Sequence, residues 1–264
     1  MNSIRSRFID WLPAVVTIVL LLVAWEVLVE VLDVQHWLLP PPSVIAAEIS
    51  DSFGFLMKQA RTTSIETLIG FVASVTLAVI IASGIVWSRT VERSLYPIII
   101  TSQTIPIITL APLLIIWVGP DMRSKIIVIV LFTFFPIVIS LVSGLRSVDQ
   151  EMVDMFRTLG ASPWQTFRKL MIPAALPNFF SGLKVAAVFS VIGAVIGEWF
   201  GSSTGLGWLM KIAGGQFQTA KIFGAIAVLS ILAMLLFAAV VALEKWSLRK
   251  YPPTAKRVIR LGES

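Results

Sequence analysis

Residues 126–145 read IIVIVLFTFFPIVISLVSGL, twenty consecutive positions without a charged side chain. A helix rises about 1.5 Å per residue, so twenty residues cover roughly 30 Å, the thickness of the hydrocarbon core of a bilayer. A helix also satisfies its backbone hydrogen bonds internally, which is the condition for crossing that core. This stretch therefore predicts a transmembrane helix and decides the fold class.

Five further stretches are as long and mostly as apolar, so the sequence predicts an all-α integral membrane protein with six transmembrane helices in one domain, residues 1–264. The expected spans are 12–32, 65–87, 95–118, 126–145, 178–200 and 222–243. The composition agrees, because 14% of the residues are charged, against about 25% in soluble chains. The fifth span contains Lys184 and Glu198, which we expect to extend toward opposite membrane surfaces.

Lys and Arg are divided unevenly between the two sides of this topology. Six of the 21 fall on one side: Lys58, Arg61, Arg123, Lys125, Lys211 and Lys221. The other fifteen share the side of both termini. Because Lys and Arg accumulate in cytoplasmic loops, both termini are predicted to be cytoplasmic. The net charge of +6 is then explained by topology and lipid headgroups, and no nucleic-acid partner is expected.

The outer segment between the first two spans, residues 33–64, contains three prolines at 40–42 that favour an extended chain. Ser43 is placed to cap a short helix, and residues 44–49 have one apolar and one polar face. A helix on the outer membrane surface and a simple tether are both compatible with this pattern.

Residues for catalysis are missing. His36 is the only histidine and there is no cysteine, so neither a Ser–His pair inside a span nor a His or Cys metal site is expected. The stretch 201–207 (GSSTGLG) lacks the Lys of a phosphate-binding loop and is interpreted as an outer turn. The chain is therefore not expected to be an enzyme or to hold a cofactor.

An ion-coupled carrier or channel is the alternative function. Such proteins usually keep ionisable residues near the membrane midplane. Here the acidic residues of the spans fall toward their outer ends: Glu26, Glu30, Glu66 and Glu198. The alternative is weakened and stays open.

The long cytoplasmic loop, residues 146–177, contains clear sequence signals for where helices start and end. Ser147 and Gln150 fit a capping box at the start of a first helix, and Gly160 fits its end. Ser162 begins a second helix, with a proline directly after it, and this helix is expected to end before Pro173. The loop is thus predicted to be helix, tight glycine corner, helix.

Each loop helix carries an apolar stripe at helical spacing. The first stripe is Met152, Met155, Phe156 and Leu159, and the second is Trp164, Phe167, Leu170 and Met171. The stripes are compatible with packing on the protein's own helices, with the lipid interface, or with insertion into a groove of a partner protein.

The loop resembles the cytoplasmic signature of ABC-importer permeases, an E-A-A triplet followed by Gly and then by I-x-L-P. Gly160 and Pro173 match it, with aliphatic residues at Leu170 and Ile172. The triplet reads DMF at 154–156, so the acid is kept as Asp and both alanines are replaced by larger residues. Further similarity to the nitrate, sulfonate, taurine and thiamine-precursor branch lies in Pro106, residues 111–113 (APL), 117–119 (WVG), 197–199 (GEW) and 205–207 (GLG).

This resemblance implies the permease subunit of a type I ABC importer in the inner membrane of a bacterium. It would pair with a second permease chain, expected to be a homodimer, and with two ATPase subunits that bind the ATP. An external substrate-binding protein would deliver a small solute, with a lean toward a thiamine-pyrimidine precursor. The residues implied in ATPase coupling are Met152, Asp154, Met155, Phe156, Leu159, Gly160, Ala161 and Pro173.

The third span is polar for a membrane helix and contains prolines. Its candidates for the translocation path are Gln103, Thr104, Pro106 and Thr109, because polar side chains and broken backbone at membrane depth are tolerated where they line a cavity. Repair of carbonyls freed by proline, or bonding between helices, is the alternative. Glu198 is expected at the outer rim, where it anchors the turn at 201–207 or contacts the binding protein.

Overall fold

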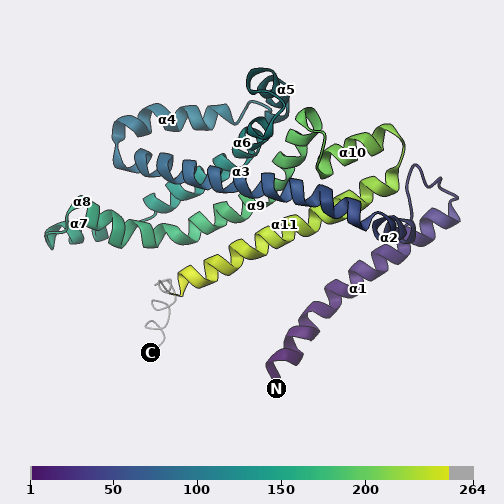
Figure 1. Cartoon of the computed structure of the whole chain (residues 1–264). Coiled ribbons are helices and arrows are strands. Elements are labelled where there is room, and N and C mark those ends of the chain that lie inside the picture. The colour runs from purple at the N-terminus through teal and green to yellow at the C-terminus, as the bar shows by residue number, and fades with distance from the viewer. Residues whose placement is uncertain (1, 250–264) are drawn as a thin grey trace.

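The computed structural model describes residues 2–249, and every regular element in that range is helical. The basic tail after Arg249 lies outside the described residues. Figure 1 shows long helices running side by side, with short helices at both ends of the bundle. The elements are α1 (Asn2–Val31), α2 (Pro42–Asp51), α3 (Phe53–Trp87), α4 (Arg89–Ser102), α5 (Ile107–Val118), α6 (Met122–Arg146), α7 (Gln150–Thr158), α8 (Pro163–Thr166), the π-helix η1 (Phe167–Met171), α9 (Ile172–Gly201), α10 (Leu206–Gly215) and α11 (Thr219–Leu248).

Helices α3, α6 and α9 form the centre of the bundle, because small residues let their backbones approach. A Cβ added at Gly182 of α9 would lie 2.7 Å from the Ser140 Cβ of α6, and one at Gly144 of α6 would lie 2.8 Å from the Asn178 Cβ of α9. Close contact through small residues is the usual way for transmembrane helices to associate. The buried core around this contact includes Ile137, Leu145 and Phe180.

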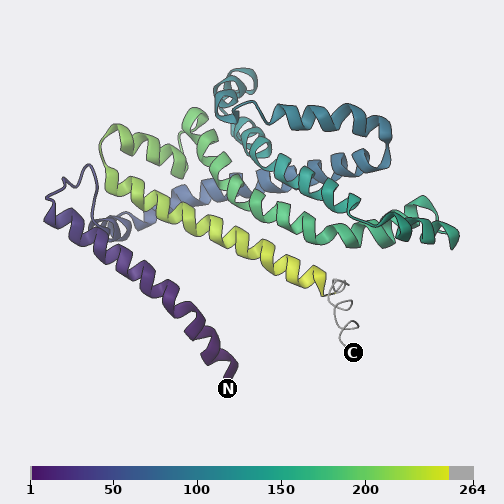
Figure 2. The same cartoon turned by 180° about the vertical axis from the view of Figure 1, so that it is seen from behind.

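Helix α1 stands apart from the bundle and meets it mainly at α2, as both views show (Figures 1 and 2). From Leu12 to Val31 most of its apolar side chains are exposed, as expected for a surface that faces lipid, whereas Val29 is buried. The contact with α2 corrects the expectation that Ser43 caps that helix. The Ser43 backbone N–H and hydroxyl instead donate to the Glu26 carboxylate of α1, at 3.0 and 2.5 Å.

Within residues 2–249, five helices are long and apolar enough to cross a membrane, and α4 with α5 gives a sixth span only as a bent pair. The third span, 95–118, was expected to have a broken backbone, and here the chain bends by 103° between its two helices. Pro106 explains the break, because it has no N–H to continue α4 and instead starts α5 in an extended conformation. The second span also begins earlier than expected, since α3 already starts at Phe53.

The two charged residues of the fifth span do not extend to opposite surfaces, which corrects that prediction. Lys184 forms an ion pair with Glu244 of α11, with Nζ 2.9 and 3.0 Å from the two carboxylate oxygens. Glu198 is fully buried within the protein. Charged groups in a membrane are stabilised by partners inside the bundle as well as by its surfaces, and α9 finds such partners at both positions.

Candidate functional site: the two ends of the bundle

The end of the bundle where α3 and α6 finish carries the loop that contains α7; we call it the α7 end. Its corner is Gly160, with φ of +78°. Nothing lies within 4 Å of a Cβ placed there, so backbone conformation rather than space requires glycine. The Ala161 N–H donates to the Phe156 carbonyl at 2.9 Å, which closes the end of α7. The expected glycine corner is confirmed.

The caps of the two loop helices differ in how well they were predicted. For α8, Ser162 Oγ accepts from the Gln165 N–H at 3.2 Å and Gln165 Oε1 accepts from the Ser162 N–H at 2.9 Å, as expected. For α7 the expected capping box is wrong. Ser147 ends α6 by donating to the Gly144 carbonyl, and Asp149 caps α7 by accepting from the Glu151 N–H at 3.1 Å. Helix α6 runs up to Arg146, directly before Ser147. Ser147 therefore caps the end of α6 and not the start of α7.

Most of the first apolar stripe is left uncovered by residues 2–249. Met152, Met155 and Leu159 are 46%, 51% and 76% exposed, whereas Phe156 is half-buried. Asp154, the acid of the signature, lies on the other side of α7 and pairs with Arg157 at 3.1 Å. One of the exposed faces of α7 is therefore apolar, and it lies at the end of the bundle.

The second stripe packs on the protein's own helices. Phe167 is buried in the central core and Met171 packs against it. Trp164 stacks on Phe167 with ring centroids 5.8 Å apart and meets the edge of Trp87, at the end of α3, at 6.2 Å. Among the alternatives left open by the sequence, packing on the protein's own helices holds for Phe167 and Met171, whereas Trp164 stays 56% exposed.

The second loop helix does not end before Pro173, which corrects the prediction. Residues Pro163–Gly201 form one continuous helical rod of 39 residues, with α8, η1 and α9 joined end to end. The reason is the π-turn at Phe167–Met171, where the Ile172 N–H donates to the Phe167 carbonyl. Such a turn shifts the hydrogen-bond ladder just before Pro173, which has no N–H to contribute. The loop is thus joined rigidly to the centre of the bundle.

The candidate path residues lie at the break between α4 and α5. Gln103, Thr104, Pro106 and Thr109 are all exposed in the single chain. The Thr104 hydroxyl donates to the Thr101 carbonyl at 2.8 Å, and the Thr109 hydroxyl donates to the Pro106 carbonyl at 2.7 Å. These bonds satisfy carbonyls at the break. Gln103 is exposed, and unlike the hydroxyls of Thr104 and Thr109 its side chain forms no hydrogen bond to another described residue, so it remains the path candidate.

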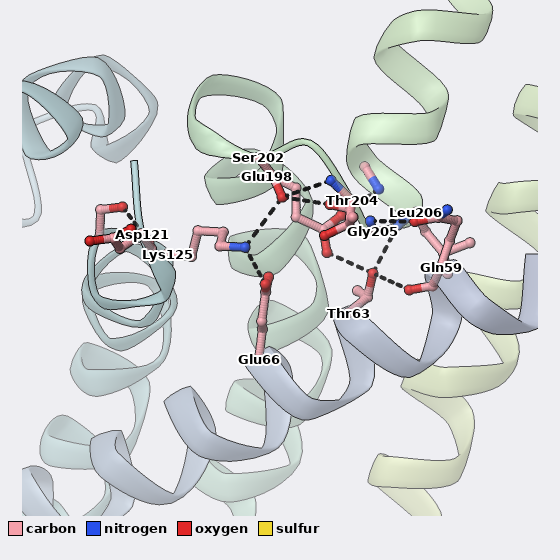
Figure 3. Close-up of polar contacts among 12 residues, drawn as sticks. Gln59, Thr63, Glu66, Asp121, Lys125, Glu198, Ser202, Thr204, Gly205 and Leu206 are labelled. Atoms are coloured by element: carbon pink, nitrogen blue, oxygen red, sulfur yellow. Dashed lines mark hydrogen bonds and ion pairs between the residues drawn. The ribbon is translucent and has the colours of Figure 1, made fainter. Parts of the chain in front are cut away.

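At the opposite end, which we call the α10 end, Glu198 is the centre of a buried network that fastens the start of α10 (Figure 3). Its carboxylate accepts from the Thr63 hydroxyl of α3 and from the Gly207 N–H, both at 2.6 Å. Thr63 Oγ1 accepts from the Leu206 N–H at 2.9 Å, and Gln59 Oε1 accepts from the Gly205 N–H at 2.7 Å. Three successive amides of the turn are thereby bound by three side chains, which we call the α10 clamp.

Two independent features require glycine at position 205: the backbone conformation and the space available to a side chain. Its φ is +105°, and a Cβ there would overlap the Glu198 carboxylate. At Gly207 a Cβ would lie 2.7 Å from the Val195 carbonyl oxygen. These glycines let the turn pass directly over the carboxylate, so the expectation that Glu198 anchors this turn is confirmed within the described residues.

A buried ion pair lies beside the clamp. Lys125 of α6 pairs with Glu66 of α3, and its Nζ is 3.2 Å from the Ser202 hydroxyl (Figure 3). Both side chains are less than a tenth exposed. The pair joins α3 to α6 at the α10 end, while the clamp joins α3 to α9 and α10.

Sequence reasoning missed α10 itself and the α3 side of this network. Gln59, Thr63 and Glu66 follow one another at helical spacing, which is the available signal that they share a face. They were placed in the outer segment or at a span edge, so their burial was not anticipated.

Five long apolar helices with one bent pair, a helical loop at one end and a clamped turn at the other together indicate a transport permease, and the comparison with known families agrees. Residues 74–251 match the family described as binding-protein-dependent transport system inner membrane component. The chain belongs to this family. It is therefore a multi-pass membrane component of an ABC importer for a small solute, and the transport role sets aside the ion-coupled carrier.

Relatives of this importer permease cover nearly its whole length. The formylaminopyrimidine transport permease protein ThiX of Halalkalibacterium halodurans is 38% identical over 85% of this chain and 90% of the relative. The riboflavin transport system permease protein RibX of Chloroflexus aurantiacus is 35% identical over 92% of both chains. The taurine transport system permease protein TauC of Escherichia coli is 28% identical over 87% of this chain and 86% of the relative.

A solved structure supports the importer fold. The MetNI methionine ABC transporter in an inward-facing conformation matches with a TM-score of 0.58 at 20% identity, over 71% of this chain and 92% of the other. The identity is low, so the likeness concerns the fold alone. It confirms the type I importer architecture expected from the loop signature.

Proposed function

We propose that this permease imports a small solute into the cytoplasm, driven by separate ATPase subunits that dock on the loop of residues 146–177. The observation that carries the proposal is the face of α7, where Met152, Met155 and Leu159 are exposed at the end of the bundle. An amphipathic helix with an apolar face of this kind fits a groove on a partner protein.

The connection of the loop to the bundle supports a mechanical role. The corner at Gly160 holds α7 against the start of a rod that runs from Pro163 to Gly201 without interruption. A displacement of α7 would therefore be passed along this rod to the α10 clamp. Two conformations of the ATPase pair would bias two positions of the rod, which is the requirement for alternating access.

The partners follow from the family. Its description names a binding-protein-dependent system, which supports an external substrate-binding protein docked at the α10 end. Two copies of this chain would form the path, with the polar break at Gln103 facing it, and two ATPase subunits would bind ATP. The charge distribution supports a cytoplasmic α7 end and both termini on the same side.

For the substrate we propose a pyrimidine precursor of thiamine or a similar small heteroaromatic solute, ahead of sulfonate, taurine or nitrate. The support is the 38% identity to a permease named for formylaminopyrimidine transport, over 85% of this chain. The likeness to permeases named for taurine and aliphatic sulfonates is 28% and 29%.

The test is a pair of lysine substitutions on α7, made in the assembled transporter. Met155→Lys places a charge on the exposed apolar face, and Thr158→Lys adds the same charge to the same helix away from that face. We expect the first variant to insert in the membrane but lose co-purification of the ATPase subunits and ATP-driven uptake, because an unpaired charge in an apolar interface is costly. Thr158→Lys should keep both. Normal uptake by Met155→Lys would overturn the docking proposal.

A further inference from the structure

A cavity of about 600 Å³ lies between the loop of residues 146–177, which we call the coupling loop, and the ends of α3 and α6. Its wall includes Trp87 at the end of α3, Arg146 at the end of α6, and Arg157 of α7. The cavity is distinct from the exposed face of α7, because Met152, Met155 and Leu159 do not line it.

The charged part of the wall is basic. Arg146 and Arg157 line the cavity, and no acidic residue lines it. Each arginine has one acidic neighbour outside the cavity: Arg146 pairs with Glu92 at 2.7 Å, and Arg157 pairs with Asp154 at 3.1 Å. Both pairs are substantially exposed and therefore weak. A guanidinium carries five N–H donors, so each arginine keeps donors for an anion in the cavity.

Two apolar cavities adjoin the basic one. The larger, about 450 Å³, shares Trp87 and Phe167 with it, and the smaller, about 160 Å³, shares Phe167 and Leu145. The smaller cavity reaches Val79 of α3. Val79 precedes Trp87 by eight residues, so the apolar surface extends about 12 Å along the helix from the basic end. The combined shape is a basic head with an apolar tail.

The depth of this site in the membrane is fixed by the helix ends. The apolar spans α3 and α6 finish at Trp87 and Arg146. Trp164 contacts Trp87, and tryptophan collects at the level of the lipid headgroups. The basic cavity therefore lies at headgroup level, and the apolar cavities extend from it toward the hydrocarbon core.

We propose that this site binds an anionic phospholipid, with its phosphate between Arg146 and Arg157 and an acyl chain along the surface from Phe167 to Val79. Basic pockets at the ends of transmembrane helices are suited to anionic headgroups. A free phosphate would leave the apolar cavities unused, and a protein segment would not need a basic site at headgroup level. The bound lipid fills the space under α7 and supports the coupling loop. The inference rests on the family's membrane topology and not on docking of an ATPase.

The experiment is lipid titration of the purified, delipidated permease–ATPase complex, followed by native mass spectrometry with phosphatidylglycerol and phosphatidylcholine as probes. We expect preferential binding of phosphatidylglycerol. Arg157→Gln should reduce that preference about fivefold, and the double variant with Arg146→Gln about 25-fold, because each basic residue near a headgroup contributes a similar factor. Arg157 is exposed, so its variant remains informative if the double variant does not fold.

Two controls separate the head from the tail. Arg168→Gln removes the same charge at the same end but lies outside the cavities, and it should leave binding unchanged. Ser83 lines both apolar cavities, so Ser83→Trp introduces a large side chain where they meet and should reduce binding of both lipids. Equal binding of the two lipids by the natural protein, displacement by glycerol phosphate alone, or binding only after removal of the ATPase subunits would overturn the proposal.

Discussion

Thr63 and Glu198 lie 135 residues apart in the sequence, and the Thr63 hydroxyl donates a 2.6 Å hydrogen bond to the Glu198 carboxylate. The same hydroxyl accepts from the first amide of α10, and the same carboxylate accepts from the second. The contact therefore joins α3, α9 and α10 at one buried point. It places α10 relative to the rod that begins at the coupling loop.

Removal of the Glu198 carboxylate should weaken the contact that joins α3, α9 and α10 and lower the stability of the protein. Glu198→Ala leaves the buried Gly207 N–H without its acceptor, at a cost of about 1–3 kcal/mol. The Thr63 hydroxyl keeps only the Gln59 carbonyl as acceptor, at 3.3 Å. Glu198→Gln keeps one oxygen acceptor of the same size and should cost less. We expect a lower melting temperature of the purified transporter for the alanine variant and a smaller decrease for glutamine. Equal stability of the alanine variant and the natural protein would contradict the role of the clamp.

The turn should tolerate no side chain at position 205. Gly205→Ala places a Cβ against the Glu198 carboxylate at a positive φ, a conformation strained by about 1–3 kcal/mol for non-glycine residues. Gly215→Ala at the end of α10 is the matched control, because nothing lies within 4 Å of its Cβ and its φ is ordinary. Thermal unfolding of the two variants should differ clearly. Similar melting temperatures would show that the turn adapts.

The corner at Gly160 should respond to backbone conformation and not to size. Gly160→Val forces a β-branched residue to φ > 0, whereas Gly160→Asn is compatible with the left-handed region. Since both have open space, only the valine variant should misplace α7. We expect it to remain in the membrane and to lose ATPase co-purification and coupled uptake. If the asparagine variant also lost both functions, any side chain at position 160 would interfere with docking of the ATPase subunits, and backbone conformation would not be the reason for glycine.

The path prediction concerns Gln103. Gln103→Leu removes a polar side chain that is exposed in the chain, so the melting temperature should change little while uptake rate or substrate preference changes. Thr76→Val of α3 is the control, because Thr76 is exposed, lies outside the break and bonds through its hydroxyl to the Val72 carbonyl of its own helix. If Gln103→Leu lowers stability and leaves the uptake of the surviving protein normal, the residue ties helices together and is not part of the path.

The orientation is testable because the chain has no cysteine. Ser203→Cys lies at the α10 end and Glu151→Cys on α7, and both positions are exposed. Glu151 is preferred to Ser162, whose hydroxyl caps α8. An impermeant thiol reagent added to intact cells should label the cysteine at 203 and spare the one at 151. The reverse pattern would place the α7 end outside.

The predictions that depend on residues close together in the sequence were more successful than those that depend on residues far apart. The helical spans, the glycine corner and the cap of α8 depend on residues within a few positions of one another. A run such as 126–145 has to form a helix in a membrane whatever packs around it. The sequence alone therefore indicated which stretches form long apolar helices, including the broken backbone around Pro106, and the loop signature identified its family.

Only the tertiary structure decided what the buried polar residues do. Lys184 was expected at a membrane surface, and Glu198 at the outer rim, where the sequence left open whether it anchors the turn at 201–207 or contacts the binding protein. In the bundle, Lys184 meets Glu244 of α11, and Glu198 meets α3 and the turn. The rod continues through Pro173 by the π-turn at Phe167–Met171, and Phe167 itself is buried in the core among residues distant in sequence. These outcomes depend on contacts between residues distant in sequence, and the stability of a buried charge or an irregular turn is set by such contacts, not by neighbours along the chain.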